Sequence, residues 1–464
     1  MFYLFILIEA AAIATYAAVR LRCVRDLFAD PTWPLLFGFA MNFCIRPLLL
    51  ALDGERFAAY SSYHGDWSFS EHDILLVSAA AATFLLSFLA ARWLAHHAGL
   101  RRIPIPTIRV RPSERLFLLV ASALVILAPL GFTGYLADTE WSGGARDLLT
   151  GQARFHILGR HMGLGQNMLG MIAGGVGCAM LCTAWSWFGC GPGRVKRMAI
   201  AAVLLCGSVY WMFGERSGIV TVLYFLGTSY IAAPRDPDSP RKRFRPRTQL
   251  LVIAICLCAF LIAGPLGSVL KGSNRNLPDV VALAISPWDG YELTLFAVAG
   301  NTATQRMNGL SYVEDVVYTY LPRVFFSDKP VRYGIYSVQD EVIPALKQMP
   351  GSFPVGFVAE AYVNFGWAGF VLVPLLLGAL CEFGSRAMRA RDGFWTVQIM
   401  LLYPNIASFR SLGSLLAQSV FDLLLCGLVW GGIRMFCYPA STVESCAPPG
   451  ATTPFPSYVV DHNL

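Results

Sequence analysis

The feature that most constrains this chain is a series of long apolar runs that recurs along most of its length. Eleven runs have the length of a helix that crosses roughly 30 Å of hydrocarbon, and they fall near residues 2–19, 32–52, 74–95, 116–136, 163–188, 198–213, 217–233, 249–270, 355–381, 394–409 and 412–433. Of the 464 residues, 56% are hydrophobic and only 14% are charged, which leaves too little polar surface for a soluble protein of this length. We therefore expect an all-α polytopic membrane protein with about 11 transmembrane helices.

Basic residues cluster in alternate connections between these runs, as at residues 20–25, 92–115, 241–247 and 386–391. Because Lys and Arg beside membrane spans are retained in the cytoplasm, this alternation predicts an outer N-terminus and an inner C-terminus. It also accounts for most of the net charge of +7. Since no soluble segment carries a basic stripe interleaved with aromatic residues, we expect no nucleic-acid partner.

The longest connection, residues 271–353, lies on the outer side and is too long for an unstructured loop, so we expect it to fold. Its apolar residues recur at helical spacing between Asp, Glu and Tyr, which favours amphipathic helices on the outer leaflet. The first, near residues 279–300, could instead be a shallow hydrophobic element. We assign residues 1–437 to one transmembrane domain that includes this loop, and residues 438–464, rich in Pro, Ser and Thr, to a disordered cytoplasmic tail.

Arginines that orientation does not require gather on or near the outer side. Arg suits phosphate because its planar donors match two oxygens at once and stay charged at any working pH. Arg46 lies roughly 10 Å below the outer end of its span. It could snorkel to the headgroups, pair with Asp53 or Glu55, or face a cavity where it has a function.

Short outer segments hold further candidates. Arg216 in FGERSGIV and Arg410 in ASFRSLG stand on tight turns that would fix their depth, although such turns also need solvated polar residues. Arg154 lies in LTGQARFHILGRHMGLGQN, whose His156 and His161 could act as a base or phosphate donor or simply face water.

The segment NTATQRMNGLSYVEDVVYTYLPRVFFSDKPVRYG mixes aromatic, acidic, amide and basic side chains. A carbohydrate groove needs this mixture, because ring faces cover the apolar side of a sugar and polar groups bind its hydroxyls. The alternative is an interfacial belt of aromatic anchors with lipid-binding Arg. The candidate substrate-binding residues here are Arg306, Tyr318, Tyr320, Asp328, Lys329 and Arg332, and Arg323 in the same segment is a candidate catalytic residue.

Glu360 and Asn364 interrupt the apolar run PVGFVAEAYVNFGWAGFVLVPLLLGAL near its outer end. They are four residues apart and share one face of a helix, with Gly356 one turn earlier. A partly desolvated Glu at the mouth of a bundle could act as a general base toward a hydroxyl. The alternative is that Glu360 pairs with an outer Arg and only fixes the bundle.

At these residues the chain resembles the O-antigen and exopolysaccharide repeat-unit polymerases of the Wzy type. The resemblance rests on GERS in a short outer turn, PRVFFSDKPVRYG late in the large loop, and the entry P-x-G-F-x-x-E-x-Y-x-N-F-G-x-x-G of the following span. It covers mainly residues 210–375.

This resemblance implies a metal-independent integral-membrane glycosyltransferase of the bacterial inner membrane, with its active site facing the periplasm. Its donor and acceptor would be glycans linked to undecaprenyl diphosphate, with membrane lipids as neighbours and a chain-length regulator protein left open as a further partner. Arg216, Arg306 and Arg323 would bind diphosphate, Glu360 would be the base, and Tyr318, Tyr320 and Asn364 would contact sugar or position the base. We expect no cofactor. The alternatives are an O-antigen ligase, a transporter or flippase of lipid-linked glycan, and an acyltransferase.

Overall fold

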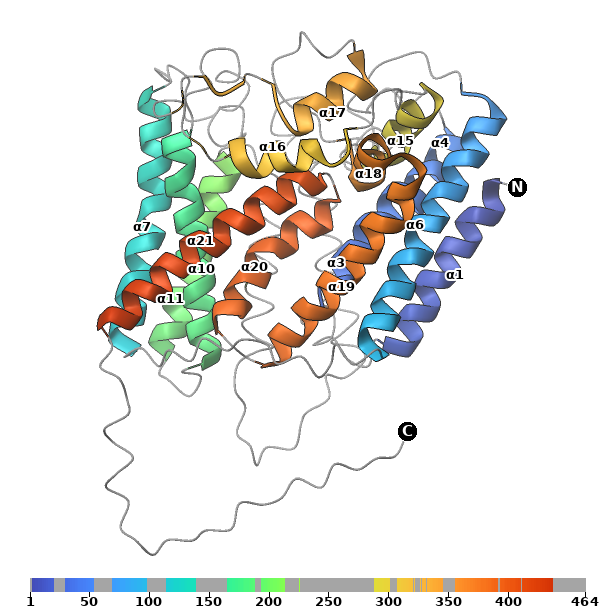
Figure 1. The fold of residues 1–464 in the computed structure, drawn as a ribbon. Coiled ribbons are helices and arrows are strands. Elements are labelled where there is room, and N and C mark those ends of the chain that lie inside the picture. The colour runs from blue at the N-terminus through green and yellow to red at the C-terminus, as the bar shows by residue number, and fades with distance from the viewer. Residues whose placement is uncertain are drawn as a thin grey trace, which may run out of the picture.

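The computed structural model describes residues 2–20, 30–53, 69–97, 114–138, 165–187, 193–212, 225, 288–300, 307–319, 321, 326, 328–330, 332–344, 355–390, 393–409 and 411–436. Within these residues the regular structure is helical throughout, without a β-strand. Long helices stand side by side as a bundle, and short helices gather at one end of it (Figure 1). The expected tail, residues 438–464, and the expected spans 217–233 and 249–270, apart from Phe225, lie outside the described residues.

The bundle is built from nine helical stretches of the described chain. They are α1 (Phe2–Arg20), the continuous run α3 (Thr32–Phe39), η1 (Ala40–Ile45) and α4 (Arg46–Leu52), α6 (Glu71–His97), α7 (Glu114–Asp138), α10 (Gly165–Trp187), α11 (Gly193–Met212), α19 (Gly369–Ala390), α20 (Gly393–Ser408) and α21 (Leu412–Phe436). Six stretches are long and apolar enough to cross a membrane, namely Phe2–Arg20, Thr32–Leu52, Glu71–His97, Arg115–Gly134, Phe357–Met388 and Leu412–Ile433. These helices mark the chain as a membrane protein.

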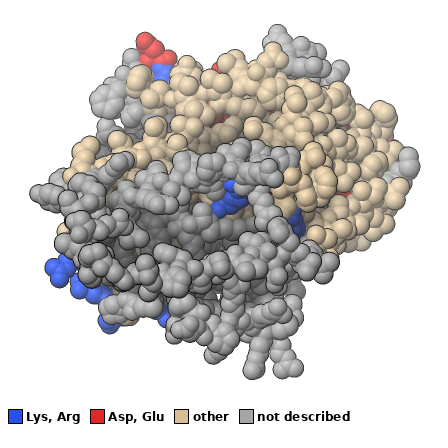
Figure 2. Space-filling view, turned by 60° about the horizontal axis from the view of Figure 1, so that its bottom comes forward, with Lys and Arg blue, Asp and Glu red and all other residues tan. Residues whose placement is uncertain are grey.

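The short helices come from the segment 271–353 and from the residues that follow it. They are α15 (Gly290–Ala299), α16 (Leu310–Tyr318), α17 (Ile335–Val342) and α18 (Phe357–Phe365). We call the end of the bundle that carries them the loop end. We call the opposite end, where α1 ends at Arg20 and α11 begins beside Arg194, the basic end. Lys and Arg side chains are visible on the molecule when the basic end is turned forward (Figure 2).

The helices α15 and α16 differ from simple amphipathic helices on a lipid surface. α15 has only ten residues, too few to cross a membrane, and most of it is buried, including Glu292. It therefore fits the alternative of a shallow hydrophobic element. α16 buries the polar residues Ser311 and Asp315 and exposes apolar residues such as Val313. Its polar face is therefore turned toward the protein.

The run 355–381, expected as one continuous span, is broken in the structure. α18 ends at Phe365, a short 3₁₀ turn η5 (Gly366–Ala368) follows, and α19 begins at Gly369. Gly366 has a φ of 61°, in a backbone region that L side chains rarely adopt. A Cβ atom on Gly369 would overlap the carbonyl of Ala361, so the two helices meet backbone to backbone. Hydropathy alone does not detect this break.

Two apolar cores hold the described helices together. One core joins α3, α6, α15, α18 and α19 around rings such as Phe84, Phe357 and Phe409, with the last two stacked at 4.5 Å between ring centroids. The other joins α7, α10, α11, α20 and the later part of α21. In that core α10 approaches α7 closely, because Gly174 and Gly177 have no side chain to hold the two backbones apart.

Candidate active site

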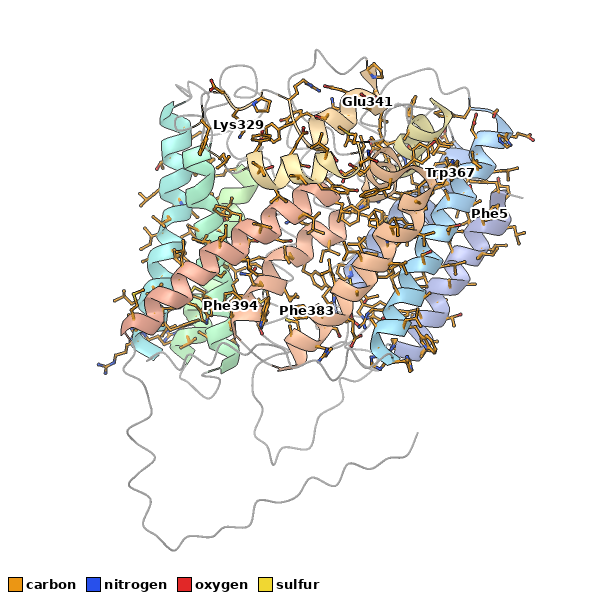
Figure 3. All side chains as sticks on the ribbon, in the orientation of Figure 1. Phe5, Lys329, Glu341, Trp367, Phe383 and Phe394 are labelled. Carbon is orange, nitrogen blue, oxygen red and sulfur yellow. The ribbon has the colours of Figure 1, made fainter. Side chains whose placement is uncertain are left out.

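The structure describes seven of the candidate site residues. These are Glu360, Asn364, Arg46, Tyr318, Asp328, Lys329 and Arg332. The others lie outside the described residues, namely Arg154, Arg216, Arg306, Tyr320, Arg323 and Arg410. The described candidates belong to the loop end, where Figure 3 labels Lys329 on the segment that follows α16 and Trp367 after α18. Phe383 and Phe394, by contrast, lie toward the basic end.

Glu360 lies on α18 and holds the N-terminus of α21. Its Oε2 accepts the backbone N–H groups of Leu412 and Gly413, with N–O distances of 2.8 and 3.1 Å. Its Oε1 is buried within range of the Ser411 side chain, and the whole residue is 1% exposed. The partial positive charge of a helix N-terminus stabilises a carboxylate placed there. The helix break at Gly366 separates α18, which carries Glu360, from α19.

Asn364 shares the face of α18 that carries Glu360, as the four-residue spacing predicts. Its Nδ2 donates to the backbone carbonyl of Glu360 at 2.9 Å, and its side chain forms hydrogen bonds of 2.8 and 2.9 Å with the Ser311 hydroxyl. The N–H of Asn308 donates to the Asn364 carbonyl at 2.9 Å. Asn364 therefore ties α18 to the start of α16.

Two acidic residues of α16 that were not among the candidates hold the start of α17. Glu314 Oε2 accepts the N–H of Gly334 at 2.7 Å and the Ser337 hydroxyl at 3.3 Å. Asp315 Oδ1 accepts the N–H of Ile335 at 3.2 Å. Burial, with a smaller contribution from the charge of Glu314, raises the pKa of Asp315 to about 7, although the hydrogen bond from Ile335 acts to lower it. α16 therefore brings two carboxylates to one helix N-terminus.

Arg46 is fully buried and forms an ion pair with Glu292 of α15, with 2.6 Å between Nε and Oε1. The sequence had offered only nearby partners, and Glu55 lies outside the described residues. Beside the pair, Asn42 Oδ1 accepts the N–H of Gly290 at 2.8 Å. Asn42 belongs to η1, a π-helical turn of the kind that often occurs at functional sites. In the sequence, the sign of a buried ion pair is Glu292 itself, an acidic residue within an apolar run.

The residues after α16 form a small aromatic and basic group. The Tyr318 and Tyr333 rings lie 5.5 Å apart, and Lys329 Nζ lies 4.9 Å from the centre of the Tyr333 ring. Arg332 lies over the Tyr336 ring and donates through Nε and Nη2 to the two oxygens of Asp340. Asp328 is exposed. The group combines ring faces and cations as a glycan groove requires, but a carboxylate already faces Arg332.

A separate buried cluster lies at the basic end and contains Arg92, which the sequence assigned only to orientation. Arg92 donates to Asp30 at 2.9 Å and to the Thr32 hydroxyl at 3.0 Å, and it pairs with Glu382. His96 lies 3.5 Å from Glu382. These groups join α3, α6 and α19, so the cluster is a cross-link between helices.

The chemistry that the loop end can perform follows from its acidic groups. Burial raises the proton affinity of a carboxylate and suits it to accept or share a proton, although backbone N–H donors oppose this effect. Among the described residues, no group of three or more His, Cys, Asp or Glu side chains is arranged to hold a metal ion. No protein-family description, no curated protein and no solved structure matches this chain.

Proposed function

We propose that this chain is an integral-membrane glycosyltransferase that polymerises oligosaccharide repeat units linked to undecaprenyl diphosphate, at the periplasmic face of a bacterial inner membrane. The observation that carries the proposal is the placement of Glu360, a buried carboxylate at the loop end of a helical membrane protein, held at the N-terminus of α21. The resemblance of residues 210–375 to O-antigen and exopolysaccharide polymerases supports the substrate class.

In the proposed reaction, a hydroxyl at the non-reducing end of the acceptor attacks the anomeric carbon of the donor glycan. The bond from that carbon to the diphosphate oxygen breaks, and its electron pair leaves with the diphosphate. The hydroxyl proton passes to Glu360, the general base. Asn364, which donates to the Glu360 backbone carbonyl, holds the helix turn that carries the base.

The departing diphosphate needs fixed positive charge, because no metal is part of the proposal. Arg216, Arg306 and Arg323 supply it in the proposed mechanism, as preorganised donors for a developing charge. Arg46 and Arg332 face Glu292 and Asp340 respectively. Because these carboxylates already balance them, we leave both arginines out of the diphosphate site. Tyr318 and Tyr320 are proposed to contact sugar.

The test is the size of lipid-linked glycan in a strain that lacks the gene, measured by mass spectrometry with and without a plasmid carrying the wild type. Single repeat units that accumulate on the lipid, with polymer restored by the plasmid, are the expected result. The plasmids with Arg216→Ala and Arg323→Ala should place protein in the membrane but stop growth at one unit. Long glycan on the lipid in the deletion strain would instead indicate a ligase.

A transporter or flippase of lipid-linked glycan is the second candidate, because the structure contains two helix discontinuities. One is the break at Gly366 between α18 and α19, and the other is the π-helical turn η1 beside the buried pair of Arg46 and Glu292. Discontinuous helices form the binding sites of many transporters. Exposure of the single units to a membrane-impermeant glycosidase in spheroplasts separates the two. A polymerase mutant leaves them accessible from outside, whereas a flippase mutant leaves them protected.

A further inference from the structure

Two carboxylates meet at Gly413, the second residue of α21. The Gly413 N–H donates to Glu360 Oε2 at 3.1 Å. A Cβ atom added to Gly413 would overlap Oδ2 of Asp315, so the Asp315 carboxylate also lies against Gly413. Glu360 and Asp315 come from α18 and α16, which Asn364 and Ser311 join. The two acids are therefore brought together by two helices and the start of a third.

Both side chains are almost fully removed from water, with Asp315 2% and Glu360 1% exposed. Backbone N–H groups donate to both, from Ile335 at the start of α17 to Asp315 and from Leu412 and Gly413 to Glu360, which also faces the Ser411 hydroxyl. Two helix N-termini supply partial positive charge, but this does not equal the full charge of a Lys or Arg. Two like charges so close in a dry site disfavour double ionisation.

Each helix packed against the Asp315–Glu360 pair contributes groups that face it. α16 contributes Glu314 and the buried hydroxyl of Tyr312, and burial also raises the Tyr312 pKa. α17 contributes its first amide, α18 contributes Asn364, and α21 contributes Ser411 with its first amides. None of these groups is basic, and Glu314 adds a third carboxyl group. Burial raises the pKa of Asp315 to about 7, as a site that retains one proton near neutral pH requires.

We propose that Asp315 is a positioning residue for Glu360, because the two carboxyl groups share one proton near neutral pH. When Asp315 holds the proton, Glu360 is ionised and ready to accept another from a hydroxyl. The catalytic part of this inference rests on the proposed function, but the shared proton does not. The titration belongs to the pair, so it has two steps that neither residue owns alone.

The test is pH-difference infrared spectroscopy of the purified full chain in lipid nanodiscs, read at the carbonyl band of buried carboxylic acids. The part of the wild-type signal that the double variant Asp315→Asn with Glu360→Gln lacks should consist of two titration steps at least about one pH unit apart. Asp315→Asn and Glu360→Gln should each abolish the upper step and leave one. Glu341→Gln, a control on α17 outside the pair, should keep both steps.

If removal of either carboxyl leaves the step of the other unchanged, the shared proton is disproved. The two variants test the pair from opposite sides, so the measurement survives the failure of one of them to fold. A polymer assay then separates the two proposals. If the protein forms polymer but the two carboxyl groups titrate independently, the proposed function stands and the shared proton is rejected. If the two groups titrate together but the protein forms no polymer, the shared proton stands and the proposed function is rejected. If both proposals hold, the pH profile of polymer formation by Asp315→Asn should contain one titration step of the pair instead of two.

Discussion

The basic end and the loop end of the bundle each bury several acidic groups, but they hold them by different means. At the basic end, Asp30 and Glu382 both contact one guanidinium, that of Arg92. At the loop end, Glu360 and Asp315 accept hydrogen bonds from the first N–H groups of α21 and α17, and no described Lys or Arg pairs with them. The first cluster pairs full charges, and the second relies on partial charges.

This difference separates a structural cluster from a reactive one. A carboxylate beside a guanidinium stays ionised over a wide pH range and holds its helices in place. A carboxylate held only by amides in a dry site can gain or lose a proton near neutral pH, as the pKa of about 7 for Asp315 indicates. We therefore expect substitutions at the basic end to change folding, and those at the loop end to change chemistry.

The largest effect is expected from Arg92→Met at the basic end. This change leaves Asp30 and Glu382 buried without their cation, which typically costs about 3–5 kcal/mol. Thermal unfolding of the purified protein should show a large loss of stability, with little protein recovered from membranes. Arg197→Met is the matched control, because Arg197 is exposed at the same end. Equal stability of the two variants would remove the distinction between the clusters.

Glu360→Gln should have the opposite profile. The amide oxygen of Gln can still accept the N–H groups of Leu412 and Gly413, so folding should change little. The base is lost, and general-base catalysis is worth about 10²–10⁴-fold in rate. Polymer formation in membranes should fall by that factor while the unfolding temperature stays near that of the wild type. Full activity would leave Glu360 only the role of capping α21.

The sequence predicted the helices better than the contacts between them. Apolar runs mark helices because a span needs about 20 apolar residues, and the described parts of the expected runs are helical. The break in the run 355–381 was missed, since hydropathy does not register the backbone conformation of Gly366. Glu360 and Asn364 were identified because polar residues in an apolar run are conspicuous.

Two parts of the loop end could not be predicted from local pattern. Arg46 and Glu292 pair across 246 positions, and nothing near Arg46 points to α15. Asp315 stood out only as one of many polar residues in its segment. Its place depends on how the starts of α17 and α21 meet, which is a property of the tertiary fold. Such sites depend on how distant helices pack, which the spacing of residues along the sequence does not predict.

A pH titration of stability should detect proton binding by the buried pair that contains Asp315. Its pKa is about 7 in the folded protein, against about 3.9 for an unperturbed Asp, so the folded state binds more protons between these values. Stability should therefore fall as pH rises from about 4 to about 7, by at most about 1.4 kcal/mol per unit, and level off above. Asp315→Asn should flatten this part of the curve in denaturant unfolding. An unchanged slope would contradict the raised pKa.

The smallest effect is expected at the link between α16 and α18. Ser311→Ala removes the hydroxyl that bonds both polar atoms of Asn364 and leaves a buried amide partly unsatisfied, which costs about 1–3 kcal/mol. Ser337→Ala, which removes a weaker 3.3 Å bond to Glu314 at a half-buried site, should cost less. Denaturant unfolding of both variants measures the difference. Because Ser311 carries no charge, its loss should leave the two titration steps of the pair in place, so a stability loss together with a changed titration would mean that α16 itself had moved.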